Sequence, residues 1–195
     1  MELSFTTARS GRINISTDGE FRFAVSAVVW YSFPYKDGDE IGEEQLTEIK
    51  NAEDRHAAYE KALSLLSVRA HSEKELIRKL RMKYPEEAAK SAAEKCAEAG
   101  LIDDGQFALL LAEELYRRKN YAPARIRQEL ENRGVDKNTA ENAVLSLDID
   151  RESGIIKILD KMKVTNESAE KDKARAFRRL LSAGYSYGEI EKVLS

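Results

Sequence analysis

The 195-residue sequence has few of the side chains on which disulfides, metal sites and membrane spans depend. It has one cysteine, Cys96, which allows no internal disulfide and no cysteine-rich metal site. No run of about eighteen apolar residues is present, so no membrane-spanning helix is predicted. The N-terminus also lacks the pattern of a secretory signal peptide. We therefore expect a cytoplasmic protein in which Cys96 is a small buried residue of a helix.

Motifs typical of catalysis or cofactor binding are also missing. The sequence contains no G-x-x-x-x-G-K-[ST], no G-x-G-x-x-G and no H-E-x-x-H. Its two histidines, His56 and His71, have no partner at a ligand or triad spacing, which favours positions on helix surfaces. Asp103 and Asp104 directly precede an apolar helical segment, which favours helix capping over an acid pair. The sequence predicts a protein that is not an enzyme and has no cofactor or metal.

Charged residues are abundant and unevenly distributed. They make up 34% of the sequence, above the usual quarter, while apolar positions keep a helical period. Residues 1–54 hold 5 lysines and arginines against 11 carboxylates, a net charge of −6. Residues 55–195 hold 27 against 24, a net charge of +3. An acidic N-terminal part therefore precedes a mildly basic helical part, which permits contact with a polyanion without requiring one.

The N-terminal part has the pattern of a β-hairpin. Residues 12–16 and 20–25 alternate polar and apolar side chains, and Asp18-Gly19 between them is a strong turn signal. The apolar run at 28–33 fits either a strand or a short helix. Because an isolated hairpin is only marginally stable in water, we expect this one to pack on the helices or on a partner.

Two helices with an exposed elbow between them dominate the middle of the chain. Four apolar residues of the first helix share a helical spacing and predict one buried face: Phe107, Leu110, Leu111 and Leu115. Asp103 is expected to cap this helix, Pro123 to begin the second, and Gly134 to end it. The elbow, residues 117–127, is rich in cations.

This pattern recurs at an interval of fifty residues. Leu80, Leu130 and Leu180 correspond, as do Gly134 and Gly184. Capping boxes are predicted at Ser72…Glu75 and Ser186…Glu189, and Asp136 is expected to cap a further helix. We predict a mainly α fold of three tandem three-helix repeats in an elongated bent array, with a small N-terminal β-hairpin. The predicted parts are 1–54 (hairpin and linker helix), 55–100, 101–148 and 149–195 (repeats 1, 2 and 3).

Cations gather at corresponding places in the three repeats. The candidate partner-binding residues are Arg78 and Lys79 in repeat 1, Arg117, Arg118, Lys119, Arg125, Arg127 and Arg133 in repeat 2, and Arg178 and Arg179 in repeat 3. Their repetition favours a face that contacts DNA or an acidic protein groove. Solvation of outer helix faces explains each residue singly about as well. Interleaved glutamates, such as Glu113 and Glu129, weaken the positive field.

Four stretches of the sequence resemble the RecX family, the regulators of the RecA recombinase. The matching segments are residues 62–80 (ALSLLSVRAHSEKELIRKL), 100–108 (GLIDDGQFA), 120–135 (NYAPARIRQELENRGV) and 184–194 (GYSYGEIEKVL). The resemblance covers about residues 58–195, and the first three segments are fairly specific in combination. Two departures are an acidic net charge of −3, where many members are basic, and Asn120 where the family often has Gly, Ser or Arg.

The resemblance implies three three-helix repeats and a monomeric, non-enzymatic protein. Such a protein would bind RecA and the RecA–DNA filament, and restrain strand exchange, ATP hydrolysis and co-protease activity in DNA repair and the SOS response. It would bind DNA itself only weakly. On this view the cations of the elbow form the central contact patch, and reversing Arg117, Arg118 and Lys119 to glutamate should weaken inhibition. The alternative from the residues is a sequence-independent DNA-binding module whose three-helix units dock like helix-turn-helix domains.

Overall fold

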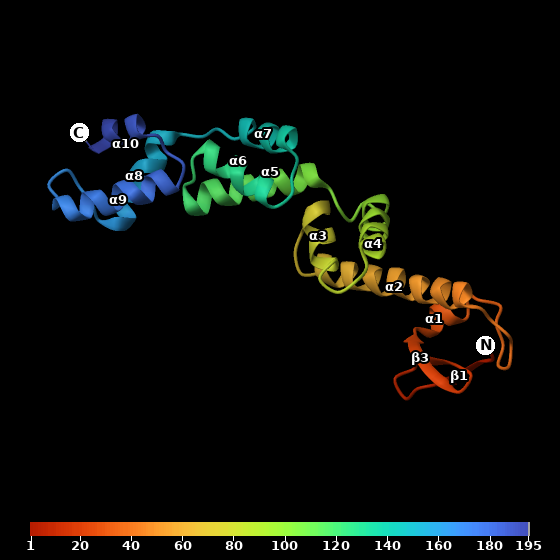
Figure 1. Ribbon diagram of the computed structural model, residues 1–195. Helices are drawn as coiled ribbons and strands as arrows, with labels where there is room; N and C mark the ends of the chain where they lie inside the picture. Colours follow the sequence, from red (N-terminus) through yellow and green to blue (C-terminus); the bar gives the residue numbers. More distant parts are fainter. Residues whose placement is uncertain (195) are drawn as a thin grey trace. The chain divides into compact units, whose positions relative to one another are not determined.

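The computed structural model describes residues 1–194, which form a small sheet followed by helices (Figure 1). Two compact units are present, residues 1–69 with 76–101 and residues 70–75 with 102–195. The elements are β1 (Leu3–Thr7), β2 (Ile13–Thr17), β3 (Glu20–Val25), α1 (Ala27–Trp30), α2 (Glu43–Leu66), α3 (Glu73–Leu80), α4 (Glu86–Glu98), α5 (Asp104–Lys119), α6 (Pro123–Asn132), α7 (Lys137–Leu145), α8 (Arg151–Met162), α9 (Glu170–Ser182) and α10 (Tyr187–Leu194). The mainly helical fold predicted from the sequence is confirmed.

The N-terminal sheet is antiparallel, with the strand order β1-β2-β3. Its second turn is the predicted one, because Asp18 and Gly19 both have positive φ, 50° and 79°. Strand β1 was not predicted, and the hairpin is in fact part of a three-stranded sheet. The outer edge of β1 is held by residues far along the chain: the Leu3 amide donates to the Asp39 carbonyl at 2.8 Å. The alternation of polar and apolar residues along a strand does not reveal a hydrogen-bond partner so far along the chain.

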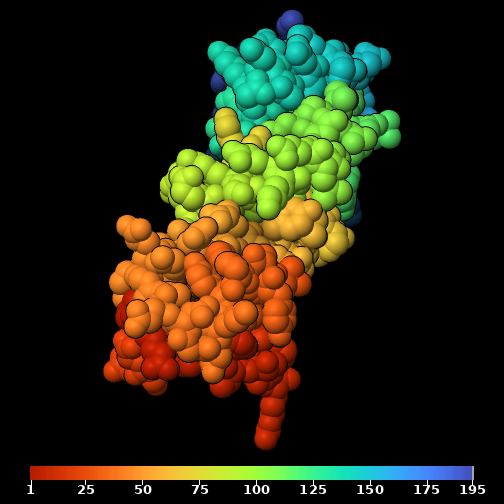
Figure 2. Space-filling view, turned by 90° about the vertical axis from the view of Figure 1, so that its right-hand side faces the viewer, coloured from red at the N-terminus to blue at the C-terminus, as the bar shows by residue number. Residues whose placement is uncertain are grey.

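A buried carboxylate fastens this sheet to α2. Glu53 is on α2, and its carboxylate accepts hydrogen bonds from Arg12 at 2.7 Å and from the amide and hydroxyl of Ser26 at 2.8 and 3.0 Å. The ambiguous apolar run begins as a helix, α1, with Trp30 buried against Phe5 at a ring distance of 4.8 Å. The hairpin therefore packs on the helices, as expected, and forms one block with the start of α2 (red and orange in Figure 2).

Helices α2 and α4 complete the first unit. Cys96 is fully buried on α4 among four alanines, as predicted, and this burial raises the pKa of its thiol. Helix α2 continues without a break through residue 54, where the sequence predicted a boundary between the N-terminal part and repeat 1. The division of the chain into four parts therefore stays a prediction.

The second unit has a single core formed by α5 to α10. On α5 the buried residues are Phe107, Ala108, Ala112 and Leu115. The prediction that Leu110 belongs to the buried face is wrong, since 58% of its surface is exposed. Two alanines shift the buried stripe of α5 relative to a count of large apolar residues, because small side chains also form close helix contacts. Leu110 therefore lies on the outer face.

The fifty-residue period corresponds to a repeated helix. Leu80 on α3, Leu130 on α6 and Leu180 on α9 are all buried, and so are the residues four positions earlier, Leu76, Ile126 and Ala176. Helices α3, α6 and α9 therefore bury the same face at the same register. Among residues 1–194, no helix has the length and apolar character that crossing a bilayer requires.

The difference between Leu130 and Leu110 gives a test by stability. Leu130→Ala should lower the free energy of unfolding by about 2–5 kcal/mol, because it opens a cavity in a close-packed core. Leu110→Ala, which removes the same atoms from an exposed position, should change it by about 0.5 kcal/mol or less. Urea unfolding followed by circular dichroism measures both. Equal losses in the two variants would contradict the assigned buried face of α5.

Candidate partner-binding site

The start of α3 is joined to the end of α6 by a compact set of polar contacts, here called joint 1 (residues 71–75 with 133–134). The Ser72 hydroxyl donates to the carbonyl of Arg133 and also caps α3 by accepting from the Glu75 amide at 3.1 Å. The Arg133 guanidinium lies 3.4 Å from the buried Glu75 carboxylate. Gly134, with φ +90°, passes so close that a Cβ would lie 2.6 Å from that of Lys74. Only glycine fits there without displacing α3.

His71 belongs to joint 1, which corrects the expectation of a histidine on the helix surface. Its side chain is only 2% exposed, and its Nδ1 lies 3.0 Å from the Glu75 carboxylate. One signal of this pair is present in the sequence, the i, i+4 spacing of His71 and Glu75 at a helix start. Two side chains thus converge on one buried carboxylate, Glu75, from opposite sides of the joint.

The two aspartates before α5 each cap a different helix. Asp103 accepts from the Gln106 amide at 2.9 Å and so caps α5, as predicted. Asp104 accepts from the Glu73 amide at 2.9 Å and so caps the start of α3. Both carboxylates therefore satisfy amide donors at helix N-termini, which would otherwise be left without partners. The pair is structural, and its second member ties α5 to joint 1.

A second joint, here called joint 2 (residues 120–125 with 183–185), repeats joint 1 fifty residues later. The Ala122 amide donates to the Ala183 carbonyl at 2.9 Å, where joint 1 has the hydroxyl of Ser72 and the carbonyl of Arg133. Gly184 has φ +93°, and a Cβ on it would lie 2.7 Å from that of Arg125. The same close approach of a glycine to the first turn of the preceding repeated helix thus occurs twice.

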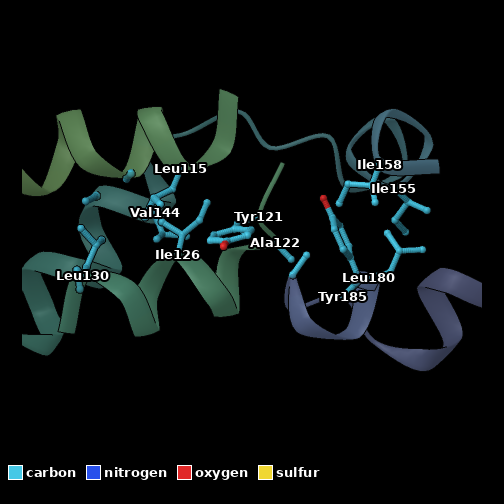
Figure 3. Packing of buried hydrophobic residues seen from close by; sticks show 14 of the residues in the cluster. Leu115, Tyr121, Ala122, Ile126, Leu130, Val144, Ile155, Ile158, Leu180 and Tyr185 are labelled. Carbon is cyan, nitrogen blue, oxygen red and sulfur yellow. The ribbon is translucent and has the colours of Figure 1, made fainter. Parts of the chain in front are cut away.

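Tyr185 fills the inner side of joint 2. Its ring lies among Ile155, Ile158 and Leu180 of the core (Figure 3), and its hydroxyl donates to the carbonyl of Asn120 at 2.8 Å. Burial of the phenol raises the pKa of Tyr185 to about 12, because the charged form would be poorly solvated. This neutral, hydrogen-bonded phenol takes the place that Val135 has in joint 1.

Most of the candidate cations in repeat 2 are already paired with carboxylates of the same repeat. Arg117 and Arg118, whose side chains are 74% and 77% exposed, pair one helical turn back with Glu113 at 2.7 Å and Glu114 at 3.0 Å. The remaining pairs are Arg125 with Glu129 at 2.5 Å and Arg127 with Glu141 at 3.8 Å, while Arg133 binds Glu75 as described. Lys119 lies 5.5 Å from the ring centre of Tyr121, and Arg125 lies 5.6 Å from it.

The candidate cations of repeats 1 and 3 are differently placed. Arg78 and Lys79 are on α3, and Arg178 and Arg179 are on α9. Among the ion pairs within residues 1–194, none involves these four side chains. The Arg178 Nε donates to the backbone carbonyl of Ala174 at 3.3 Å, which leaves its positive charge unopposed by a carboxylate. Of the ten candidates, five are paired with a carboxylate, Lys119 lies against the ring of Tyr121, and the four of repeats 1 and 3 have no carboxylate partner among the described residues.

Comparison with known proteins identifies this arrangement of helices. Residues 58–96 match the family model described as RecX, first three-helix domain, and residues 103–144 match RecX, second three-helix domain. The chain is 30% identical over 187 residues to the regulatory protein RecX of Clostridioides difficile, covering 94% of this chain and 88% of that one. It is also 30% identical over 190 residues to that of Caldanaerobacter subterraneus, covering 96% and 94%. The chain belongs to the RecX family.

Solved structures of RecX proteins have a similar fold. A crystal structure of regulatory protein RecX matches with a TM-score of 0.65 at 24% identity, covering 98% of each chain, which supports the fold. RecX from Lactobacillus salivarius matches with a TM-score of 0.57 at 25% identity, covering 73% of this chain and 96% of that one. The relatives are named regulatory proteins, and in residues 1–194 of this RecX chain no His, Cys, Asp or Glu residues are grouped to hold a metal ion.

The stretches that resemble RecX supply most of the residues of both joints. Ser72 and Glu75 come from the first, Asp104 from the second, Arg133 and Gly134 from the third, and Gly184 and Tyr185 from the fourth. Sequence reasoning found Ser72, Glu75 and Asp104 as caps, Gly134 as a helix end and Arg133 as a candidate cation. It missed their contacts with one another, because residues about sixty positions apart meet only after the helices pack. In this chain the matching stretches therefore include residues that join one repeated helix to the next.

Gly184 allows a test of joint 2. Gly184→Ala should lower the free energy of unfolding by about 2 kcal/mol or more, because it combines an unfavourable φ with a contact against the backbone of α6. Gly188→Ala is a matched control, since its Cβ would meet nothing within 4 Å and its position is helical. It should leave stability unchanged or raise it by up to about 1 kcal/mol. Thermal unfolding distinguishes the two, and equal behaviour would contradict the close approach.

Glu189 gives a prediction for acid stability. The Arg151 guanidinium at 2.7 Å and the hydroxyl of Ser186 lower its pKa to about 2, from an ordinary value of 4.5. A depressed folded-state pKa stabilises the fold above about pH 4.5, and that stabilisation is lost as pH falls towards 2. Glu189→Gln should therefore cost about 1 kcal/mol at pH 7, after screening by solvent, and almost nothing near pH 2. Urea unfolding at both pH values checks this, and a pH-independent difference would contradict it.

Proposed function

We propose that this chain regulates the RecA recombinase by binding RecA and its nucleoprotein filament. Binding would inhibit the recombinase, ATPase and co-protease activities of RecA, and so act in DNA repair and the SOS response. The proposal is supported by likeness to regulatory proteins named RecX over nearly the whole chain. In this proposal the protein acts in the cytoplasm, as a monomer and without catalysis of its own.

The observation that carries the mechanism is the repeated joint. Joints 1 and 2 hold the starts of α3 and α6 against the ends of α6 and α9 through the same pair of positions. Helices fixed in this way within one unit, such as α6 and α9, keep their solvent faces at set positions, so little ordering is needed when a partner binds. A filament also presents the same surface repeatedly, which suits a chain built from repeats. Inhibition would then follow from occupancy of the filament, without any chemical step.

The contacts of this proposal are drawn from among the cationic candidates in the three repeats. They are Arg78, Lys79, Arg117, Arg118, Lys119, Arg125, Arg127, Arg133, Arg178 and Arg179. Exposed positive side chains attract an acidic protein surface or DNA over about 8–10 Å at ordinary salt. The alternating carboxylates of repeat 2 keep the attraction to naked DNA weak, which favours the RecA–DNA filament over DNA alone as the target.

RecA ATP hydrolysis on single-stranded DNA provides the test. Adding the chain in increasing amounts should lower the hydrolysis rate until the filament is saturated. A control with labelled single- and double-stranded DNA, without RecA, should show weak binding at two salt concentrations. An unchanged ATPase rate at a molar excess of the chain over RecA would refute the proposal. Tight binding to DNA alone with a steep salt dependence would favour the DNA-binding module instead.

A further inference from the structure

The three repeated helices differ most at their solvent faces. Helices α3, α6 and α9 bury the same register, so residues 78, 128 and 178 correspond, and so do residues 79, 129 and 179. At the first position the residues are Arg78, Gln128 and Arg178, all exposed. At the second they are Lys79, Glu129 and Arg179. Repeats 1 and 3 therefore present two adjacent cations where repeat 2 presents an amide and a carboxylate.

Net charge follows the same alternation. Residues 55–100 hold 10 lysines and arginines against 7 carboxylates, a net charge of +3. Residues 101–148 hold 7 against 9, a net charge of −2, and residues 149–195 hold 10 against 8, a net charge of +2. The repeat with the most conspicuous run of cations, Arg117-Arg118-Lys119, is thus the acidic one. In this repeat carboxylates outnumber cations.

Ion pairing increases the difference in available positive charge between repeat 2 and the other two repeats. Arg117, Arg118, Arg125 and Arg127 each have a carboxylate of their own repeat within 2.5 to 3.8 Å. A partner carboxylate would have to displace that internal one, and would meet the repulsion of the displaced group. Arg78, Lys79, Arg178 and Arg179 bring no such competitor, since none of the ion pairs within residues 1–194 includes them. An unpaired exposed cation therefore contributes more to association.

We propose that the contact with the protein partner is made by the solvent faces of α3 and α9, through Arg78 with Lys79 and Arg178 with Arg179, and not by the elbow of repeat 2. The chemistry that fits each pair is a small cluster of carboxylates on a protein surface. This inference rests on the proposed function and specifies where that function is located. Two separate anchors joined in one chain strengthen each other by raising the effective concentration of the second.

Protein carboxylates fit better than DNA phosphates because the charge is interrupted. DNA is negative along its whole length, so a net charge of −2 between the two cationic repeats opposes continuous tracking of the backbone. The first turn of α9 also carries two carboxylates, Glu170 and Asp172, beside its cations. A protein surface can carry separate acidic clusters with neutral or basic groups between them. Alternating charge on this chain matches such a surface.

Variants that copy residues from repeat 2 into the other repeats test this inference with little risk to folding. Arg78→Gln with Lys79→Glu, and Arg178→Gln with Arg179→Glu, introduce the residues that α6 already has at the same register. Arg117→Gln with Arg118→Glu is the matched control, since it makes the same change of charge at the elbow. Circular dichroism should show unchanged helix content in all three. Binding of the labelled chain to RecA filaments and inhibition of ATP hydrolysis are then measured together.

We expect each outer pair to weaken binding and raise the half-inhibitory concentration about tenfold, and the combination of both pairs to weaken them further. The elbow control should stay within about twofold of wild type. A larger loss in the elbow control than in the outer pairs, with wild type still inhibiting, would overturn this inference and leave the proposed function standing. Wild type that neither binds nor inhibits would overturn both.

The same variants on single-stranded DNA without RecA separate the two kinds of partner. The outer pairs should change the affinity for DNA no more than the elbow control does. A selective loss of DNA affinity in the outer-pair variants, equal to their loss on the filament, would mean that these cations contact phosphates. That result would overturn the assignment to protein carboxylates.

Discussion

One hydrogen bond, made twice, joins the start of one repeated helix to the end of the next. The carbonyl at the end of one repeated helix, at residue 133 or 183, accepts a hydrogen bond from the residue that precedes or caps the previous repeated helix, Ser72 or Ala122. A glycine must follow that carbonyl, because any Cβ would strike the neighbouring helix. The bond thus requires positive φ at Gly134 and Gly184 and close-packed first turns in α3 and α6. The remaining contacts of the joints, including those of Glu75 and Tyr185, are built around it.

Local chemistry made much of the fold predictable. The caps Asp103, Asp136 and Ser186 act within three residues of their own position, and the fifty-residue period survives because α3, α6 and α9 bury the same face. Predictions failed where a distant partner decides the outcome. Strand β1 depends on Asp39, and the burial of His71 depends on α3 being covered at joint 1. Leu110 was misplaced because two alanines, which a count of large residues ignores, form the close helix contact.

The candidate site shows a different limit of sequence reasoning. A run of cations such as Arg117-Arg118-Lys119 is conspicuous in the sequence. Its electrostatic effect depends on which charged side chains lie one helical turn away. Glu113 and Glu114 are four residues earlier, a spacing that favours ion pairs on a helix and was visible in the sequence. The pairs of Arg127 with Glu141 and Arg133 with Glu75 cross between helices and were not visible. The less conspicuous Arg178 and Arg179 gain importance for the same reason.

The two joints differ in their tolerance of mutation. In joint 2 the donor is the main-chain amide of Ala122, which every amino acid except proline supplies, so substitutions there leave the bond in place. In joint 1 the donor is the hydroxyl of Ser72. A single substitution that removes this hydroxyl leaves the Arg133 carbonyl without its donor. Sequence drift in this protein is therefore constrained unequally. Joint 1 depends on the identity of one side chain. The hydrogen bond of joint 2 is made by the backbone, so most substitutions leave it intact.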